Sequence, residues 1–276
     1  MITSIEQRLQ PECTSDGAGV NLMRYIGNGI NNHVDPFLLF DCFHSDNPND
    51  YIAGFPSHPH RGFETVTYIL EGSLKHEDNK GHVGNINSGD VQWMTAGKGI
   101  IHSEMPQQKN GLLYGFQIWI NLPSHEKMCA PQYQEVQCKD IAIDSSVKGQ
   151  KIKVIAGETP SGLTGIVKTK LPSVIFWDVT LDPSSSFDLS VPGSSSTLIF
   201  VIKGSLLIGK EDQVNNNELI KVGGLGETTL TTHNGSHFLV ISAPTINEHI
   251  ERYGPFVMNT QEEIRKAISD YNRGDF

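Results

Sequence analysis

The stretch His58-Pro-His-Arg-Gly-Phe-Glu-Thr-Val-Thr-Tyr68 places two histidines two residues apart and then runs into β-branched and aromatic residues. A second stretch, Gln92-Trp-Met-Thr-Ala-Gly-Lys-Gly-Ile-Ile-His102-Ser-Glu-Met-Pro106, carries a histidine and a glutamate with the same spacing. Side chains two residues apart on a strand point to the same face of a sheet. On two adjacent strands, the three histidines and the glutamate would therefore share one face.

Metal binding explains such a face better than an ordinary core does. Each buried imidazole needs a partner and a buried carboxylate needs a counter-charge, and a divalent metal ion supplies both. The alternative is that the four side chains form a solvated outer face. Either motif alone arises by chance in a chain of 276 residues, as the unrelated His249-Ile-Glu251 illustrates. The argument therefore depends on the two motifs occurring together.

The rest of the chain reads as strands separated by turns, which suits its 27 glycines and 14 prolines. We expect an antiparallel β-sandwich or barrel, and a second all-β half after a polar stretch at 123–150. The expected strands are 65–70, 73–76, 91–95, 100–104, 112–122, 151–156, 174–181, 197–202, 205–208, 227–232 and 237–242. Only residues 260–271 have helical periodicity, with Asn259 or Thr260 as the cap and an apolar face of Ile264, Ala267, Ile268 and Tyr271.

A weak internal repeat links the two halves. Tyr68-Ile-Leu-Glu-Gly-Ser-Leu74 aligns with Phe200-Val-Ile-Lys-Gly-Ser-Leu206 at an offset of 132 residues, from 206 minus 74. The two predicted domains are residues 1–130 and 131–276, and the terminal helix belongs to the second. By the same offset Ser190, Pro192 and Ser196 replace His58, His60 and Glu64, so the second domain should hold no metal. We expect seven other histidines to lie at the surface or in loops: His33, His44, His76, His82, His233, His237 and His249.

Charge and composition exclude several classes of protein. The 31 acidic and 21 basic residues give a formal charge of -10, which would repel the phosphate backbone of nucleic acids. No apolar run is long enough to cross a bilayer, and residues 1–8 lack the apolar core of a secretory signal. The four cysteines form no C-x-x-C pair, so we expect them to be reduced and structural. The predicted protein is a cytoplasmic monomer, or a nuclear one in a eukaryotic cell.

The quoted motifs resemble those of a known family. Gly54-x-x-x-His58-x-His60-x-x-x-Glu64-x7-Gly72 resembles the first cupin motif, and Gly89-x9-Gly99-x-x-His102 resembles a lengthened second one. In full, the two stretches quoted above resemble the pirin family almost residue for residue, more loosely as far as Arg252-Tyr-Gly-Pro-Phe-Val-Met258. The resemblance implies a bicupin fold of two antiparallel jelly-roll barrels. It also implies that iron or another divalent ion is held at His58, His60, His102 and Glu104.

Glu64 competes with Glu104 for the role of fourth ligand. Glu64 occupies the usual cupin glutamate position, but on a straight strand it would lie about 13 Å beyond His60, at about 3.3 Å per residue. We therefore expect Glu104 to bind the metal and Glu64 to support the site or the fold without touching the ion.

Three imidazoles and a carboxylate suit Fe(II), with Mn, Co, Ni and Cu as alternatives, and they leave two positions open on an octahedral ion. The resemblance implies an oxidoreductase, a quercetin 2,3-dioxygenase that binds a flavonol and dioxygen, opens the heterocycle and releases carbon monoxide. Glu104 is the expected general base, and the expected apolar walls are Phe55, Trp93, Met94, Phe116 and Trp119. Two alternatives remain: a regulatory protein that binds a transcription factor or metabolic enzyme with iron as redox sensor, and an isomerase or another cupin reaction without oxygen.

Overall fold

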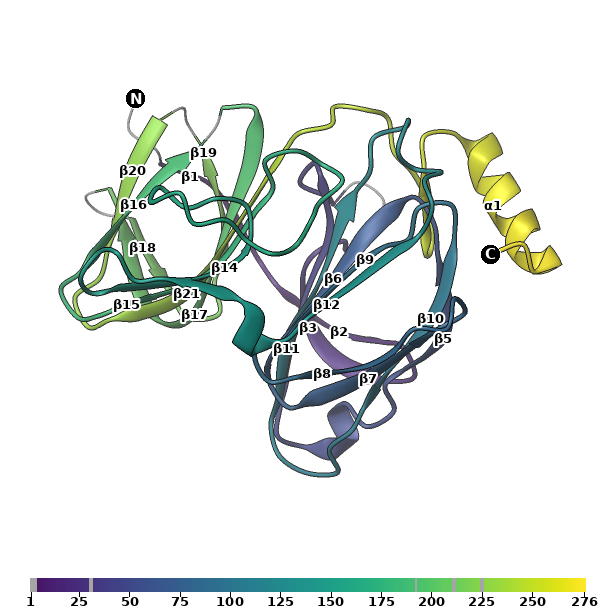
Figure 1. Cartoon of the computed structure of the whole chain (residues 1–276), viewed down its shortest axis with the longest axis horizontal. Helices are drawn as coiled ribbons and strands as arrows, with labels where there is room; N and C mark the ends of the chain where they lie inside the picture. Colours follow the sequence, from purple (N-terminus) through teal and green to yellow (C-terminus); the bar gives the residue numbers. More distant parts are fainter. Residues whose placement is uncertain (1–3, 30–31, 192, 210–211, 224–225) are drawn as a thin grey trace. The chain divides into compact units, whose positions relative to one another are not determined.

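Strands dominate the computed structural model, which describes residues 4–29, 32–191, 193–209, 212–223 and 226–276. Residues 1–3, part of the stretch compared with a secretory signal, and Pro192 lie outside the described residues. The chain divides into two units (Figure 1). The first unit comprises Pro11–Lys139 and Ile246–Phe276, and the second comprises Met1–Gln10 and Asp140–Thr245.

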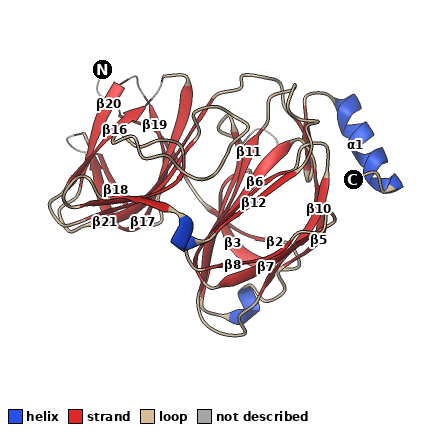
Figure 2. Ribbon diagram, viewed as in Figure 1, coloured by secondary structure: helices blue, strands red, loops and turns tan. Residues whose placement is uncertain are grey.

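Two large sheets make up most of the first unit (Figure 2). The larger follows the order β12-β9-β6-β11-β4-β3-β2 and the smaller follows β5-β10-β7-β8. Their strands are β2 (Glu12–Asp16), β3 (Val20–Ile26), β4 (Phe37–Ser45), β5 (Phe55–His60), β6 (Phe63–Glu71), β7 (Ser73–Asp78), β8 (Val83–Asn87), β9 (Val91–Thr95), β10 (Ile100–Pro106), β11 (Leu113–Asn121) and β12 (Gln132–Val136). Short 3-10 turns occur at Pro48–Asp50 and Cys138–Asp140.

The core of the first unit lies between these sheets. Leu74 and Ile86 of the smaller sheet pack in one cluster with Val20, Phe43 and Ile69 of the larger sheet. All five side chains are almost completely buried. A core between two antiparallel sheets is the pattern of a β-sandwich.

The second unit has ten paired strands along the order β1-β19-β17-β21-β15-β14-β13, with β16, β18 and β20 joined at the side. Its strands are β1 (Ser4–Leu9), β13 (Ala142–Asp144), β14 (Gln150–Ala156), β15 (Ile175–Leu181), β16 (Ser186–Val191), β17 (Ser195–Ile208), β18 (Asp212–Asn215), β19 (Leu219–Gly223), β20 (Gly226–Thr231) and β21 (Ser236–Pro244). The all-β prediction is confirmed. Among the described residues the pairings form sheets with edge strands rather than continuous closed barrels.

The repeated Gly-Ser-Leu segment has the same structural role in both units. Gly72 lies between β6 of the larger sheet, which ends at Glu71, and β7 of the smaller sheet, which begins at Ser73. Gly204 lies within β17, which pairs with β19 and β21 before this glycine and with β18 and β20 after it. The φ angles are +97° and +80°, which a residue with a Cβ rarely adopts. The expected strands at 197–202 and 205–208 are therefore one strand that changes sheets at this glycine.

The two units do not coincide with the predicted domains 1–130 and 131–276. Strand β1 pairs with β19 and so belongs with the second half of the chain. At the other end, β22 (Glu251–Tyr253), β23 (Phe256–Met258) and helix α1 (Gln261–Arg273) belong with the first unit. The cause is local pairing and packing, because Phe256 and Met258 share a buried cluster with Ile264 and Ala267 of the helix.

Helix α1 begins as its sequence predicts, and it ends at Arg273, two residues beyond the predicted range. The Thr260 side chain accepts a hydrogen bond from the Glu263 backbone, and Gly274 ends the helix in the left-handed conformation. Asp270 forms a buried ion pair with Arg61 at 2.7 Å, and the Arg61 guanidinium lies 4.3 Å from the ring centroid of Phe276. These contacts attach the helix to the turn between β5 and β6. Within the described residues, no helix has the length and apolar content needed to span a membrane.

A buried lysine holds the returning C-terminal segment against β6. The Lys127 ammonium donates to the carbonyl oxygens of Gly62 and Val257 at 2.8 and 3.0 Å, and to Oδ1 of Asn121 at 2.6 Å. Only 1% of the residue is exposed, and burial lowers the pKa of its ammonium to about 7. Three donors thus satisfy three acceptors that would otherwise be unsatisfied.

Replacing this lysine should destabilise the first unit. Lys127→Met keeps the apolar stem but leaves the three oxygens without their donor, so we expect the free energy of unfolding to fall by about 2–4 kcal/mol. Urea denaturation followed by tryptophan fluorescence measures this change. Lys98→Met is the matched control because Lys98 is exposed in the same unit. Equal stability of the two variants would contradict the role of Lys127.

Candidate metal centre

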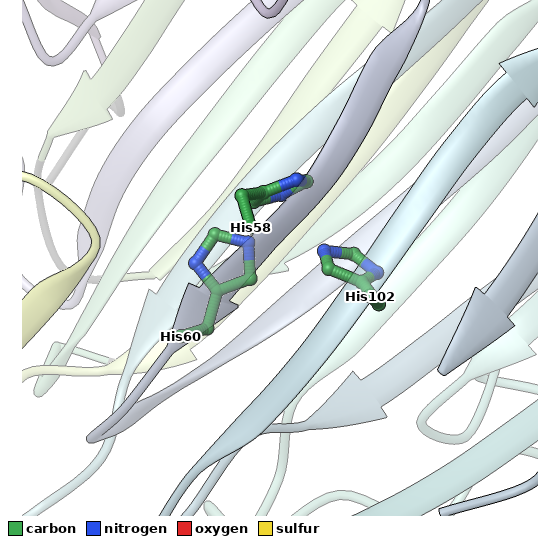
Figure 3. Close-up of side chains that lie close together, drawn as sticks. All are labelled: His58, His60 and His102. Carbon is green, nitrogen blue, oxygen red and sulfur yellow. The ribbon is translucent and has the colours of Figure 1, made fainter. Parts of the chain in front are cut away.

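The three histidines of the two sequence motifs meet because β5 and β10 are antiparallel neighbours. His102 lies opposite His58 in the register, and Ile100 lies opposite His60. The register shifts after His102, so that Glu104 pairs with Phe55. Figure 3 shows the imidazoles of His58 and His60 from one strand beside that of His102 from its neighbour. The structure thus places the three histidines of the two motifs together.

The imidazole rings are close enough to share one ion. Each offers a ring nitrogen, and these three atoms all lie within 4.8 Å of one another. The ring centroids are 4.4 Å apart for His58 and His102, 4.7 Å for His58 and His60, and 4.9 Å for His60 and His102. Among the described residues, this is the one group of three or more candidate ligands that converges in this way.

Burial keeps two of these imidazoles in the neutral form that binds metals. The pKa of His60 and that of His102 lie well below the usual value, because burial disfavours the charged ring and the neighbouring histidines add to the effect. Within the described residues, no hydrogen bond of normal geometry reaches either ring nitrogen of His60 or Nε2 of His102. Buried nitrogen lone pairs without a donor are a poor structural core but a good metal site. The residues present therefore fit a divalent ion.

Glu104 lies on the same strand as His102 and, like His58 and His60, lines a cavity of the first unit, but it is not part of the converging histidine group. It is buried, and the hydroxyl of Thr67 donates to its Oε1 at 2.7 Å. Glu64 lies on β6 in the larger sheet, where its Oε1 accepts a hydrogen bond from Thr95 at 2.7 Å. Glu64 is not among the residues that line the cavity. Of the two carboxylates, only Glu104 thus faces the space in front of the histidines.

His76 is a residue that the sequence analysis placed wrongly. It was expected at the surface, but it is fully buried on β7, opposite Glu104 in the register with β10. Its Nδ1 lies 3.3 Å from Nδ1 of His102, so one of these nitrogens donates to the other. Its Nε2 lies 3.7 Å from the Asp78 carboxylate. The available signal was its spacing of two from the apolar Leu74, which puts both side chains on the buried face.

This contact directs the free nitrogen of His102 toward the other two imidazoles. Because Nδ1 of His102 is engaged by His76, Nε2 is the atom left for a metal ion. Histidine ligands in proteins commonly use the second ring nitrogen for such a contact, which fixes the ring orientation.

His82 is exposed as expected, and its ring stacks on that of Tyr133 with 4.9 Å between the ring centroids.

A cavity of about 580 Å³ opens beside the histidines, between the two sheets of the first unit. Phe55 and Trp119 line it, as expected for apolar walls. The other three proposed wall residues, Trp93, Met94 and Phe116, do not line it and are fully buried elsewhere in the unit. Strand alternation explains the difference for β11, because residues 116 and 119 are an odd number apart and face opposite sides.

The cavity is also lined by charged and polar side chains that the sequence did not indicate. Arg24 of β3, Asp41 of β4, Gln117 of β11 and Arg252 of β22 all line the cavity. Arg24 donates to both oxygens of Asp41, at 2.8 and 2.6 Å. Burial raises the pKa of Asp41 to about 6, despite this pairing. Gln117 could have been found from its spacing of two from Trp119, whereas Arg252 gave no local signal.

The second unit offers no comparable group. Ser190, aligned with His58 through the repeat, is exposed on β16, while the position aligned with His60 lies outside the described residues. His233 is exposed as expected, and His237 is hydrogen-bonded through Nε2 to Asp178. His249 is also exposed as expected, but it belongs with the first unit. Within the described part of the chain, the candidate ligands are therefore confined to the first unit.

Comparisons with known proteins agree with this architecture. The family model Pirin matches residues 19–120, and the model of the pirin C-terminal cupin domain matches residues 176–276. A Pseudomonas aeruginosa protein with the provisional name quercetin 2,3-dioxygenase is 43% identical over 265 residues, or 94% of this chain and 93% of the relative. Human pirin is 43% identical over 263 residues, or 93% of this chain and 88% of the relative. The crystal structure of quercetin 2,3-dioxygenase from Acinetobacter baumannii has a TM-score of 0.90 and 35% identity, covering 100% of this chain and 99% of that one.

The geometry predicts one divalent ion per chain. The double replacement of His58 and His60 by alanine should abolish metal binding because it removes two of the three converging imidazoles. The matched control is the double replacement of His233 and His249, which are exposed. Elemental analysis of the purified proteins measures both. Two ions per chain, or loss of metal in the control, would contradict the assignment.

A second prediction concerns His76. His76→Phe keeps an aromatic ring in the same space but removes the nitrogen that contacts His102, so the dissociation constant of the metal should rise by about 10- to 100-fold. Titration against a metal chelator measures the change. His82→Phe, which alters the exposed ring on the other side of Tyr133, is the control and should leave metal affinity unchanged. A His76 variant with wild-type affinity would show that the contact does not orient His102.

Proposed function

The chain belongs to the pirin family, and from that premise we propose that it is a metal-dependent dioxygenase that opens the heterocycle of flavonols such as quercetin. The single observation that carries the proposal is the group of three converging histidines beside a cavity of about 580 Å³. A cavity of this size lies within the range that holds small organic ligands. The likeness to a solved quercetin 2,3-dioxygenase over the whole chain supports the choice of substrate.

His58, His60 and His102 would hold the ion, with Glu104 as the fourth ligand. Imidazole and carboxylate donors suit Fe(II) best among the candidates, and Mn, Co, Ni and Cu also accept this set. Such an ion, when bound, acts as a Lewis acid toward a substrate oxygen and supplies the redox chemistry that dioxygen requires.

The side chain that we assign to proton transfer is Glu104. Its carboxylate faces the cavity, and the hydrogen bond from Thr67 holds it in one orientation. A general base must lie within hydrogen-bond reach of the proton that it removes. In this role Glu104 accepts the proton of the flavonol 3-hydroxyl and returns it to the product. Overall, the flavonol and one molecule of dioxygen give a ring-opened ester and one molecule of carbon monoxide.

Phe55 and Trp119 would position the planar substrate. Both are half-buried and line the cavity, so each can present a ring to a flavonol. Trp119 is itself held in place by two ring contacts. The centroid of its ring lies 4.5 Å from that of Phe63 and 5.1 Å from that of His60. Aromatic walls of this kind bind flat ligands through stacking and exclude water from the reacting atoms.

Iron-loaded protein should consume oxygen and release carbon monoxide when quercetin is added under air. An oxygen electrode and a carbon monoxide assay measure the two gases. Glu104→Gln keeps a neutral oxygen donor but removes the base, so we expect turnover to fall by about 100-fold or more. Glu64→Gln should have a smaller effect, since Glu64 does not line the cavity.

The variants are compared at equal metal content, so that a change in rate reflects the carboxylate and not loss of the ion. If wild-type protein consumes no oxygen with Fe, Mn, Co, Ni or Cu, the regulatory function replaces this one. If Glu64→Gln alters the metal spectrum while Glu104→Gln leaves spectrum and rate unchanged, the fourth ligand is Glu64.

A further inference from the structure

The cavity contains two arginines in very different electrostatic surroundings. Arg24 is neutralised, because its guanidinium donates to Asp41 and also to Asp16 at 2.6 Å. Arg252 has no carboxylate within 4.0 Å among the described residues. A buried or half-buried cation normally pairs with an anion. Arg252 is thus the cation in the cavity whose natural partner is still to be identified.

The Arg252 guanidinium is held by two weak hydrogen bonds. Its Nε donates to the carbonyl oxygen of Gly254 and its Nη1 to that of Leu38, both at 3.3 Å. These distances are at the long end of the range for N–H···O bonds. A guanidinium has five N–H donors, so three are not engaged by any hydrogen bond within the described part of the chain. These donors have the planar, forked geometry that matches a carboxylate.

Trp119 fixes the position of this guanidinium relative to the histidines. The Cζ atom of Arg252 lies 4.9 Å from the ring centroid of Trp119, which is a cation–π contact. The ring of Trp119 also contacts that of His60, at 5.1 Å between centroids. One indole ring therefore contacts both Arg252 and the histidine group. An aromatic ligand stacked on this wall would be near both.

The formal charges of the cavity favour a ligand with a single negative charge. Its lining includes three carboxylates, Asp16, Asp41 and Glu104, and two guanidiniums, Arg24 and Arg252. The formal charge of these five groups is therefore -1. A divalent ion at the histidines would change the formal charge of the cavity to +1, which a bound monoanion neutralises.

We propose that Arg252 forms an anion-binding subsite in this cavity, and that the substrate is a planar aromatic molecule that carries one ionised acidic group. This inference rests on the proposed function. It narrows the substrate class from flavonols in general to those that bind with one acidic group ionised. Arg252 acts as a positioning residue. It holds the anionic group with forked hydrogen bonds while the rings stack against the aromatic wall.

The test compares two probes of the same shape, 2-naphthoate and its neutral amide 2-naphthamide, by isothermal titration calorimetry. The protein is loaded with zinc(II), which has no redox chemistry, so that binding is measured without turnover. Wild-type protein should bind the carboxylate about 10-fold or more tightly than the amide, because the guanidinium forms a two-point ion pair with a carboxylate but only a hydrogen bond with the neutral amide oxygen.

Arg252→Met removes the charge but keeps an apolar stem over Trp119. We expect it to weaken naphthoate binding by about 10-fold or more and to leave naphthamide binding unchanged. Arg252→Lys keeps the charge without the fork and should give an intermediate loss for naphthoate alone. The matched control is Arg265→Met, because Arg265 is exposed on α1. Metal content and thermal unfolding are measured for each variant.

Three outcomes would overturn the subsite. The first is that wild-type protein shows no preference for the carboxylate. The second is that Arg252→Met weakens both probes equally, as a packing role requires. The third is that Arg252→Met leaves naphthoate binding unchanged, which would place the carboxylate on the metal ion. None of these measurements uses oxygen. A protein that binds naphthoate through Arg252 but consumes no oxygen with quercetin would contradict the proposed function alone.

Discussion

The antiparallel register between β5 and β10 is the constraint on which the site depends. It puts His102 opposite His58, while the period of two along β5 puts His60 on the same face. A slip of one residue in this pairing would turn an entire set of side chains to the other face and separate the imidazoles. The same register, through its shift after His102, brings Glu104 into the cavity. The position of every candidate ligand is therefore set by main-chain hydrogen bonds between two strands.

Metal binding by the buried imidazoles depends on the groups that surround them. Low pKa values keep His60 and His102 neutral at physiological pH, so a metal ion does not compete with protons for their nitrogens. The contact from His76 occupies one nitrogen of His102 and leaves the other for the ion. For His102, one nitrogen is thus engaged by the neighbouring strand of the smaller sheet and the other is left for the ion, which is common among histidine ligands.

The C-terminal segment completes the first unit, although it follows the second unit in the chain. Lys127 joins it to β6 through the carbonyl oxygens of Gly62 and Val257, and α1 is attached through the ion pair between Arg61 and Asp270. The same segment places Arg252 in the cavity wall. The charged residues of the cavity wall therefore come from both the N-terminal part of the chain and its C-terminal segment.

The sequence by itself determined the all-β fold, the capped C-terminal helix and the two motifs at 58–60 and 102–104, because each follows from periodicity over a few neighbouring residues. It could not determine that His76 is buried behind His102, that Trp93 and Phe116 face away from the cavity, or that Arg252 enters it. Those outcomes depend on which strands pair, in which register, and on where a distant segment returns. Local sequence fixes which face of a strand a side chain occupies, but only the tertiary structure decides what lies opposite that face, since burial and partners are properties of packing between elements.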